Sequence, residues 1–178
     1  MTDFTKIEYL KNGNQKQVLA YKILSEYKVL ANIAEFDPIL VGTIPINIDI
    51  ENSDLDIICY CKNKEYFIEK LKSFFGNKNE FTIREPIIDN EETVVANFKI
   101  ERFEIEIFGQ NIPVKNQNGY KHMIIEHKIL QSKGEDFRLE IIKLKQKGYK
   151  TEPAFGFLLG LKGNPYQELL NHKINSAS

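Results

Sequence analysis

The chain has 178 residues, with 24 basic and 25 acidic side chains and a formal net charge of −1. About 42% of the residues are apolar and 28% are charged, which is the balance of an ordinary globular domain. This composition excludes collagen-like, disordered and disulfide-stapled proteins. A charge so close to zero predicts no strong nucleic-acid footprint, with a local basic groove as the open alternative. The length favours a single domain with a sizeable core.

Two features bear on where the protein resides. The N-terminal segment MTDFTKIEYLK has no apolar stretch after a basic start, and the apolar runs elsewhere are only a few residues long. The two cysteines, Cys59 and Cys61, lie in one apolar segment and are expected to be free thiols in a reducing compartment. We therefore expect a cytoplasmic protein without a membrane span.

The first part of the chain mixes helical and extended patterns. Residues 3–10 predict a short helix that ends at Asn12-Gly13, and residues 15–35 predict one long helix with apolar side chains at helical spacing. Asp37-Pro38 ends that helix, and a short β-prone run follows at residues 39–41.

Extended and helical patterns then alternate. Residues 54–61 predict a strand that is polar on one face at its start and buried on both faces at its end. Residues 64–75 predict a helix. Three further strands are expected at 80–87, 93–100 and 102–108.

The last third of the chain is helical throughout. Four helices are expected, at about 120–132, 135–147, 152–160 and 165–173. No linker separates them from the preceding strands. We therefore expect one domain over 1–178, in which an α/β core at 1–115 carries a packed helical extension at 116–178.

The most informative segment runs from residue 41 to residue 58, VGTIPINIDIENSDLDII. Asp54 and Asp56 share one face of the predicted strand, roughly 6–7 Å apart. Two carboxylates that face the same way repel each other and lose hydration when buried, so they favour a bound cation between them. Oxygen ligands of this kind suit Mg²⁺.

A third carboxylate is available on the strand at 102–108. Glu104 and Glu106 alternate there with apolar residues. If this strand pairs with that of Asp54 and Asp56, Glu106 completes a three-carboxylate site, and Glu104 replaces it if the register differs by two. The alternative interpretation is an edge strand with a solvated face.

The string formed by Gly42-Thr43, Ser53-Asp54-Leu55-Asp56 and the later Glu106-Ile107-Phe108 resembles the signature of the polymerase-beta-like nucleotidyltransferase superfamily. Together with YLKNGN, Gln117, His122-Met123 and NPY, it is similar to an uncharacterised bacterial family, domain of unknown function 4269. The resemblance implies an α+β fold with a nucleotidyltransferase-like mixed sheet flanked by helices and an all-helical C-terminal extension.

The resemblance also implies an activity and roles for residues. It implies Mg²⁺-dependent transfer of a nucleoside monophosphate from a nucleoside triphosphate to the hydroxyl of an unknown acceptor, a small molecule or a protein. Asp54, Asp56 and Glu106 would be the catalytic residues and the ligands of two metal ions. Gly42 and Thr43 would bind the nucleotide phosphates. Ser53 would turn the chain into the strand or contact a phosphate.

Two departures support an alternative function. Asn47 stands where many small members have a second glycine, and Ile44-Pro45-Ile46 replaces a segment that often contains an arginine. The alternative is a catalytically degenerate protein of this fold that binds a nucleotide or a partner protein.

His122 and Glu126 are a weaker candidate for a metal site. Their i, i+4 spacing places them on one face of the helix predicted at 120–132. No third ligand is evident in the sequence, so we expect a surface or packing pair.

Overall fold

The computed structural model describes residues 2–172. A six-stranded sheet has the order β1-β2-β6-β5-β3, and the short strand β4 pairs with β5 beside this path. Strands β2 and β6 run parallel to each other, and the other pairs are antiparallel. The strands are β1 (Ile39–Val41), β2 (Leu55–Tyr60), β3 (Asn79–Arg84), β4 (Ile87–Ile88), β5 (Glu91–Ile100) and β6 (Phe103–Gln110).

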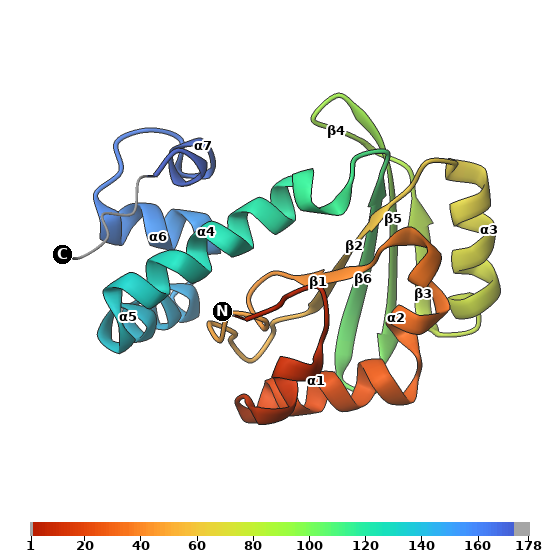
Figure 1. Ribbon diagram of the computed structural model, residues 1–178, viewed down its shortest axis with the longest axis horizontal. Coiled ribbons are helices and arrows are strands. Elements are labelled where there is room, and N and C mark those ends of the chain that lie inside the picture. The colour runs from red at the N-terminus through yellow and green to blue at the C-terminus, as the bar shows by residue number, and fades with distance from the viewer. Residues whose placement is uncertain (1, 173–178) are drawn as a thin grey trace.

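Helices cover both faces of this sheet (Figure 1). The α-helices are α1 (Gln15–Glu26), α2 (Val29–Asn32), α3 (Lys64–Phe75), α4 (Asn118–Lys133), α5 (Glu135–Gln146), α6 (Thr151–Leu159) and α7 (Pro165–Leu170). Short 3₁₀ helices lie at η1 (Glu8–Asn12), η2 (Ala34–Phe36) and η3 (Val114–Asn116). The architecture is α+β, with a mixed sheet between two groups of helices, as the sequence predicts.

The alternation of side chains along β2 divides the core into two clusters. Leu55 and Ile57 pack with α1, α2 and α3 in one cluster. Ile58 points to the other face and packs with residues of α4 to α7 in the second cluster. Asp56 has the same parity as Ile58, so its side chain faces the C-terminal helices.

The long helix predicted over 15–35 is wrong as a single element. The chain forms α1, α2 and η2 instead, and Lys28 between α1 and α2 has a left-handed backbone with φ of 52°. The break turns Val29 and Ile33 into the core, where both are fully buried. Helical spacing continues across the break, which is why the sequence pattern did not reveal it.

Smaller differences occur elsewhere. The predicted helix at 3–10 is a 3₁₀ turn at Glu8–Asn12, and Asp3 instead accepts a hydrogen bond from the Thr5 backbone N–H at 3.0 Å. The strand predicted at 80–87 is divided into β3 and β4. The other predicted strands and helices are present with boundaries that differ by at most two residues, except that the last helix, predicted over 165–173, ends at Leu170. Position 173 lies outside the described residues.

Glycine residues and a side-chain cap allow the C-terminal helices α6 and α7 to pack closely and to end where they do. A Cβ on Gly156 in α6 would lie 2.9 Å from the Pro165 side chain at the start of α7. Gly160 ends α6 in a left-handed conformation, with φ of 67°. Asn164 caps α7 with its side chain, and Pro165 occupies the first turn. Within residues 2–172, no helix combines the length and the apolar character needed to span a membrane.

Candidate functional site

A cleft of about 300 Å³ lies between the sheet and the C-terminal helices. The sheet side is formed by the end of β1 with its following turn, by β2 and by β6, and the opposite side by α4 and the start of α6. Its ionisable lining residues are Asp56, Glu106, His122, Glu126 and Glu152. This concentration of metal-ligating side chains makes the cleft the candidate functional site.

The parallel pairing of β2 and β6 places Asp56 directly beside Glu106. Neighbouring strands lie about 4.8 Å apart, and paired residues point to the same face. We call Asp56 and Glu106 the acid pair. Glu104 lies two residues earlier on β6, where it is exposed and forms an ion pair with Lys99 at 3.4 Å. Glu106 rather than Glu104 is therefore the β6 carboxylate of the cleft.

The turn after β1 depends on glycine at position 42. Gly42 has φ of 84°, a left-handed conformation that disfavours side chains, and a Cβ there would lie 2.5 Å from Oδ2 of Asp56. The Asp56 carboxylate thus rests directly on the backbone of this turn. Thr43 follows in the cleft lining, and its hydroxyl donates to Oγ of Ser53 at 3.1 Å.

The surroundings of Asp56 disfavour its charge. Burial, together with the nearby carboxylates of Asp54 and Glu106, raises the pKa of Asp56 to about 7, while Lys145 opposes the shift. None of the ion pairs within the described residues involves Asp56. A cation at this position would relieve the repulsion.

Glu106 already has polar partners from two neighbouring strands. Its Oε2 accepts hydrogen bonds from Arg84 of β3 and from Asn97 of β5, each at 3.2 Å. The side chain of Arg84 is 60% exposed, so this ion pair is weak and readily displaced.

Asp54 and Ser53 lie at the entrance to β2. Asp54 is exposed and precedes the strand, and it is not among the residues that line the cleft. Ser53 accepts a hydrogen bond from the Ile50 backbone N–H at 2.9 Å, which shapes the turn into the strand. Of the three predicted carboxylates, the cleft brings together Asp56 and Glu106, while Asp54 acts on Asp56 through its charge.

The backbone of the loop between β1 and β2 accepts hydrogen bonds from side chains of α1 and of α5. Gln17 of α1 donates to the Ile44 carbonyl at 2.8 Å, and Lys145 of α5 donates to the Ile48 carbonyl at 2.7 Å. Arg138 of α5 donates to the Asn47 carbonyl at 2.7 Å. Asn47 has φ of 60°, which explains why glycine or asparagine suits this position.

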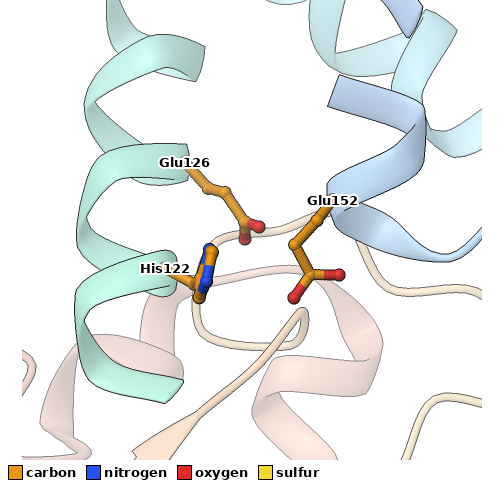
Figure 2. A group of neighbouring side chains, drawn as sticks. All are labelled: His122, Glu126 and Glu152. Atoms are coloured by element: carbon orange, nitrogen blue, oxygen red, sulfur yellow. The ribbon is translucent and has the colours of Figure 1, made fainter. Parts of the chain in front are cut away.

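The helical wall of the cleft carries three further metal-ligating side chains (Figure 2). His122 and Glu126 project from one face of α4, and Glu152 projects toward them from α6. One ligand atom from each lies within 4.8 Å of the other two. We call these three residues the helical cluster. Among the described residues it is the one group of three histidine, cysteine or acidic side chains that meets so closely.

Sequence reasoning missed Glu152, Lys145, Arg84 and Asn97. No sequence pattern points to Glu152, because it comes close to α4 only through the packing of α6 against the other C-terminal helices. Lys145 did carry a signal, since it lies four residues after the buried Ile141 on the apolar face of α5. Burial lowers the pKa of Lys145 to about 8.

A second, larger hollow of about 610 Å³ lies away from these residues. It is lined mainly by apolar side chains, with Asp37 and Lys115 as its charged residues. It contains no pair of carboxylates and no histidine. The smaller cleft is therefore the site with the chemical groups for metal binding or catalysis.

Solved structures with similar folds show what this arrangement resembles. The Cid1 poly(U) polymerase with Mg 3'-dATP bound matches with a TM-score of 0.57 and 11% identity over 82% of this chain and 48% of that chain. A cytoplasmic RNA terminal U-transferase matches at 0.53 and 14% identity over 88% and 52%. The GLD-2/RNP-8 complex matches at 0.52 and 13% identity over 86% and 61%.

These likenesses show that the chain has a nucleotidyltransferase fold, although it spans only about half to three fifths of the length of those proteins. The comparison with curated proteins finds no match. A family model described as "Domain of unknown function (DUF4269)" matches residues 22–172. This match covers the whole sheet and all four C-terminal helices, and the chain therefore belongs to the DUF4269 family.

Proposed function

We propose that the cleft binds a nucleoside triphosphate and Mg²⁺ and transfers a nucleoside monophosphate to the hydroxyl of an acceptor. One observation carries this proposal: Asp56 and Glu106 lie side by side on parallel strands, against the Gly42 turn, within a nucleotidyltransferase fold. Phosphoryl transfer needs clustered carboxylates of this kind, because charge develops on the phosphate oxygens as the bond breaks.

The residues present fit Mg²⁺. Asp56 offers a carboxylate that none of the described cations neutralises by a direct ion pair, and Glu106 offers a second carboxylate whose arginine partner is exposed. Asp54 is close enough to raise the pKa of Asp56 and would reach the site through water or a small movement. Mg²⁺ bound there would neutralise phosphate charge and orient the transferred group.

The chain itself would bind the rest of the nucleotide. Thr43 offers its hydroxyl at the cleft, and the backbone of Gly42 has no side chain to keep a phosphate away. Glu106, which Arg84 and Asn97 hold in place, is positioned to accept a proton from an acceptor hydroxyl. Ser53 supports Thr43 through the hydrogen bond between their hydroxyls.

The alternative function is a nucleotide- or protein-binding module that has lost catalysis. The exposure of Asp54 outside the cleft lining favours it, since a complete site of this type would need that carboxylate. The ion pair between Arg84 and Glu106 favours it too, because it occupies an oxygen that a metal ion would use.

The acceptor could be a nucleic acid, which the net charge of the chain alone would not indicate. A solved structure of similar fold is described as an RNA terminal U-transferase. The expectation of no strong nucleic-acid footprint is therefore not supported by the comparisons, and an RNA 3′ hydroxyl joins the small-molecule and protein hydroxyls to be tested.

The test is incubation of the full chain with each labelled nucleoside triphosphate, with Mg²⁺, and with an RNA oligonucleotide or small hydroxyl compounds as acceptors. Release of pyrophosphate is the readout. Glu106→Gln should lower the rate by a factor of roughly 10² or more, because it removes a carboxylate needed in the transition state. Glu104→Gln, on the same strand but outside the cleft, is the matched control and should leave the rate unchanged.

A wild-type protein that binds nucleotide by calorimetry but releases no pyrophosphate would support the binding module instead. Equal rates for Glu106→Gln and Glu104→Gln would contradict the assignment of Glu106 to the reaction.

A further inference from the structure

The helical cluster of His122, Glu126 and Glu152 has the geometry of a metal site (Figure 2). The i, i+4 spacing on α4 sets the first two side chains on one face, and the first turn of α6 brings Glu152 against them. One ligand atom from each residue lies within 4.8 Å of the others. Ligands around one ion of about 2.0–2.2 Å bond length lie somewhat closer than this, so a shift of about 1 Å in the half-buried Glu152 would close the site.

Two atoms of this cluster are buried without a partner. Nδ1 of His122 and Oε1 of Glu126 make no hydrogen bond, although the two residues are only 8% and 3% exposed. A buried polar atom without a partner is costly, and most such atoms are satisfied by protein, water or an ion. Both atoms here belong to residues that are metal ligands by chemical type, and both residues line the same cleft.

Neighbouring protein groups do not supply the missing cation. Lys145 of α5 faces Glu126 and Glu152, but its ammonium group donates to the Ile48 carbonyl at 2.7 Å. None of the ion pairs among the described residues includes Glu126 or Glu152. Tyr166 of α7 packs edge-on to the His122 ring, with 6.2 Å between the ring centroids. Lys145 therefore acts on the two carboxylates only at a distance, and no cationic side chain among the described residues pairs directly with Glu126 or Glu152.

We propose that His122, Glu126 and Glu152 bind a divalent transition-metal ion, of the class of Zn²⁺, at a site separate from the acid pair. The imidazole nitrogen favours Zn²⁺ and its transition-metal neighbours over Mg²⁺, which prefers oxygen ligands. Three protein ligands leave a coordination position open, as in catalytic zinc sites, and this cluster opens to the cleft that the acid pair also lines. A metal ion at this site could therefore coordinate an oxygen or nitrogen atom of a molecule bound in the cleft.

The proposal is tested by titrating Co²⁺ into the full-length, metal-stripped protein and following the visible absorption of the bound ion, with Zn²⁺ as the competitor that displaces it. Four variants distinguish binding at the helical cluster from binding at the acid pair. Glu152→Gln and His122→Gln remove ligands of the helical cluster. Asp56→Asn removes a ligand of the acid pair. His127→Gln is the matched control, because His127 lies on the same helix but packs edge-on to Phe4 instead.

We expect one Co²⁺ per chain in the wild type, with displacement by Zn²⁺ and no displacement by Mg²⁺ at similar concentration. Glu152→Gln and His122→Gln should each weaken binding roughly 10–100-fold or more. Asp56→Asn and His127→Gln should leave the affinity unchanged. Thermal melts of each variant establish that it is folded. If His122→Gln fails to fold, Glu152→Gln still tests the site, because Glu152 is only half-buried.

The proposal is overturned if the wild type binds no Co²⁺ or Zn²⁺, if both ligand variants bind as tightly as the wild type, or if Asp56→Asn abolishes binding. These outcomes do not depend on nucleotidyl transfer. A protein that binds Co²⁺ as expected but transfers no nucleotide would retain this site and lose the proposed function.

Discussion

At the scale of single residues, the contact between Gly42 and Asp56 decides the shape of the candidate site. Gly42 offers its bare backbone to the Asp56 carboxylate, and it does so in a left-handed conformation. The carboxylate is also crowded by the charges of Asp54 and Glu106, which together with burial raise its pKa to about 7. Close packing and charge repulsion at one residue are typical of sites that trade stability for function.

The first prediction concerns Asp56→Asn. The folded-state pKa of Asp56 lies above the ordinary aspartate value of 3.8, so the folded protein binds more protons than the unfolded chain between about pH 4 and pH 7. The contribution of Asp56 to stability is therefore favourable at low pH and is lost as the pH rises through 7. Without added metal at pH 8, Asp56→Asn should be neutral or stabilising by up to a few kcal/mol.

The measurement is urea unfolding of both proteins at pH 5 and pH 8 in the presence of a chelator. The difference between them should be larger at pH 8, and Mg²⁺ should stabilise the wild type alone. Lys145 carries a lowered pKa near 8 and faces Asp54 as well, so the comparison uses the difference between variant and wild type at each pH. A clear loss of stability in Asp56→Asn would instead indicate a structural hydrogen bond.

The second prediction concerns Gly42→Ala. The added Cβ would lie 2.5 Å from Asp56 Oδ2, and the positive φ adds backbone strain of roughly 1–2 kcal/mol. Gly160→Ala is the matched control, because Gly160 has φ of 67° in the left-handed region and nothing within 4 Å of its Cβ position. Chemical unfolding should show a larger destabilisation for Gly42→Ala, and calorimetry should show weaker Mg²⁺-nucleotide binding for that variant alone. Equal effects of the two substitutions would mean that the carboxylate does not depend on this turn.

At the scale of elements, local pattern identified most helices and strands but not the break after α1. The helix α3 and the strand β1 match their predicted bounds, because their boundaries carry local signals: Asn63 caps α3 with a hydrogen bond at 2.8 Å to the Tyr66 N–H. The break at Lys28 carries no glycine or proline. It is imposed by the packing of Val29 and Ile33 against the sheet, which a single-helix pattern does not encode.

The third prediction tests that break. Lys28 is exposed and has φ of 52°, so Lys28→Gly should relieve left-handed strain and be neutral or stabilising by about 1 kcal/mol. Lys22→Gly, at an exposed position inside α1, should destabilise the protein by about 1 kcal/mol. Thermal unfolding of the two variants measures the contrast, and destabilisation of equal size would indicate that the helix continues through Lys28 in solution.

At the scale of the whole molecule, the sheet has two cores that share its strands. One cluster lies between the sheet and α1, α2 and α3, and the other between β1, β2, the loop that joins them and the C-terminal helices. Phe155 of α6 and Leu169 of α7 are fully buried in the second cluster. The helical part therefore covers a sheet face that would otherwise expose apolar side chains and the candidate site.

The fourth prediction is that the chain behaves as one domain over 1–178, and that truncation after Tyr149 prevents cooperative folding. The truncation removes α6 and α7, and with them several buried side chains worth roughly 1.5–3 kcal/mol each. It also removes Glu152 from the cleft. Circular dichroism melts of residues 1–149 should show no sharp transition. A fragment that is soluble and melts cooperatively would show that α6 and α7 are a detachable module.

The sequence by itself determined the classes of element, their order and the segment that carries the acid pair. Hydrophobic periods, caps and turn residues act over a few positions, so strands and helices can be inferred locally. The resemblance carried by Gly42, Asp54 and Asp56 indicates the segment of the candidate site. Asp56 faces the cleft because alternation along β2 is a local property. The resemblance favours Glu106 over Glu104, and the register of β2 with β6 places Glu106 beside Asp56.

Only the tertiary structure decided which side chains share the cleft. Asp54 lies one residue before β2 and outside the cleft lining, Arg84 and Asn97 reach Glu106 through the order of the strands, and Glu152 meets His122 and Glu126 through the packing of two helices. These contacts join residues far apart in the chain. Such proximity depends on strand register and helix packing, which arise from the summed burial of many side chains and leave no local mark in the sequence.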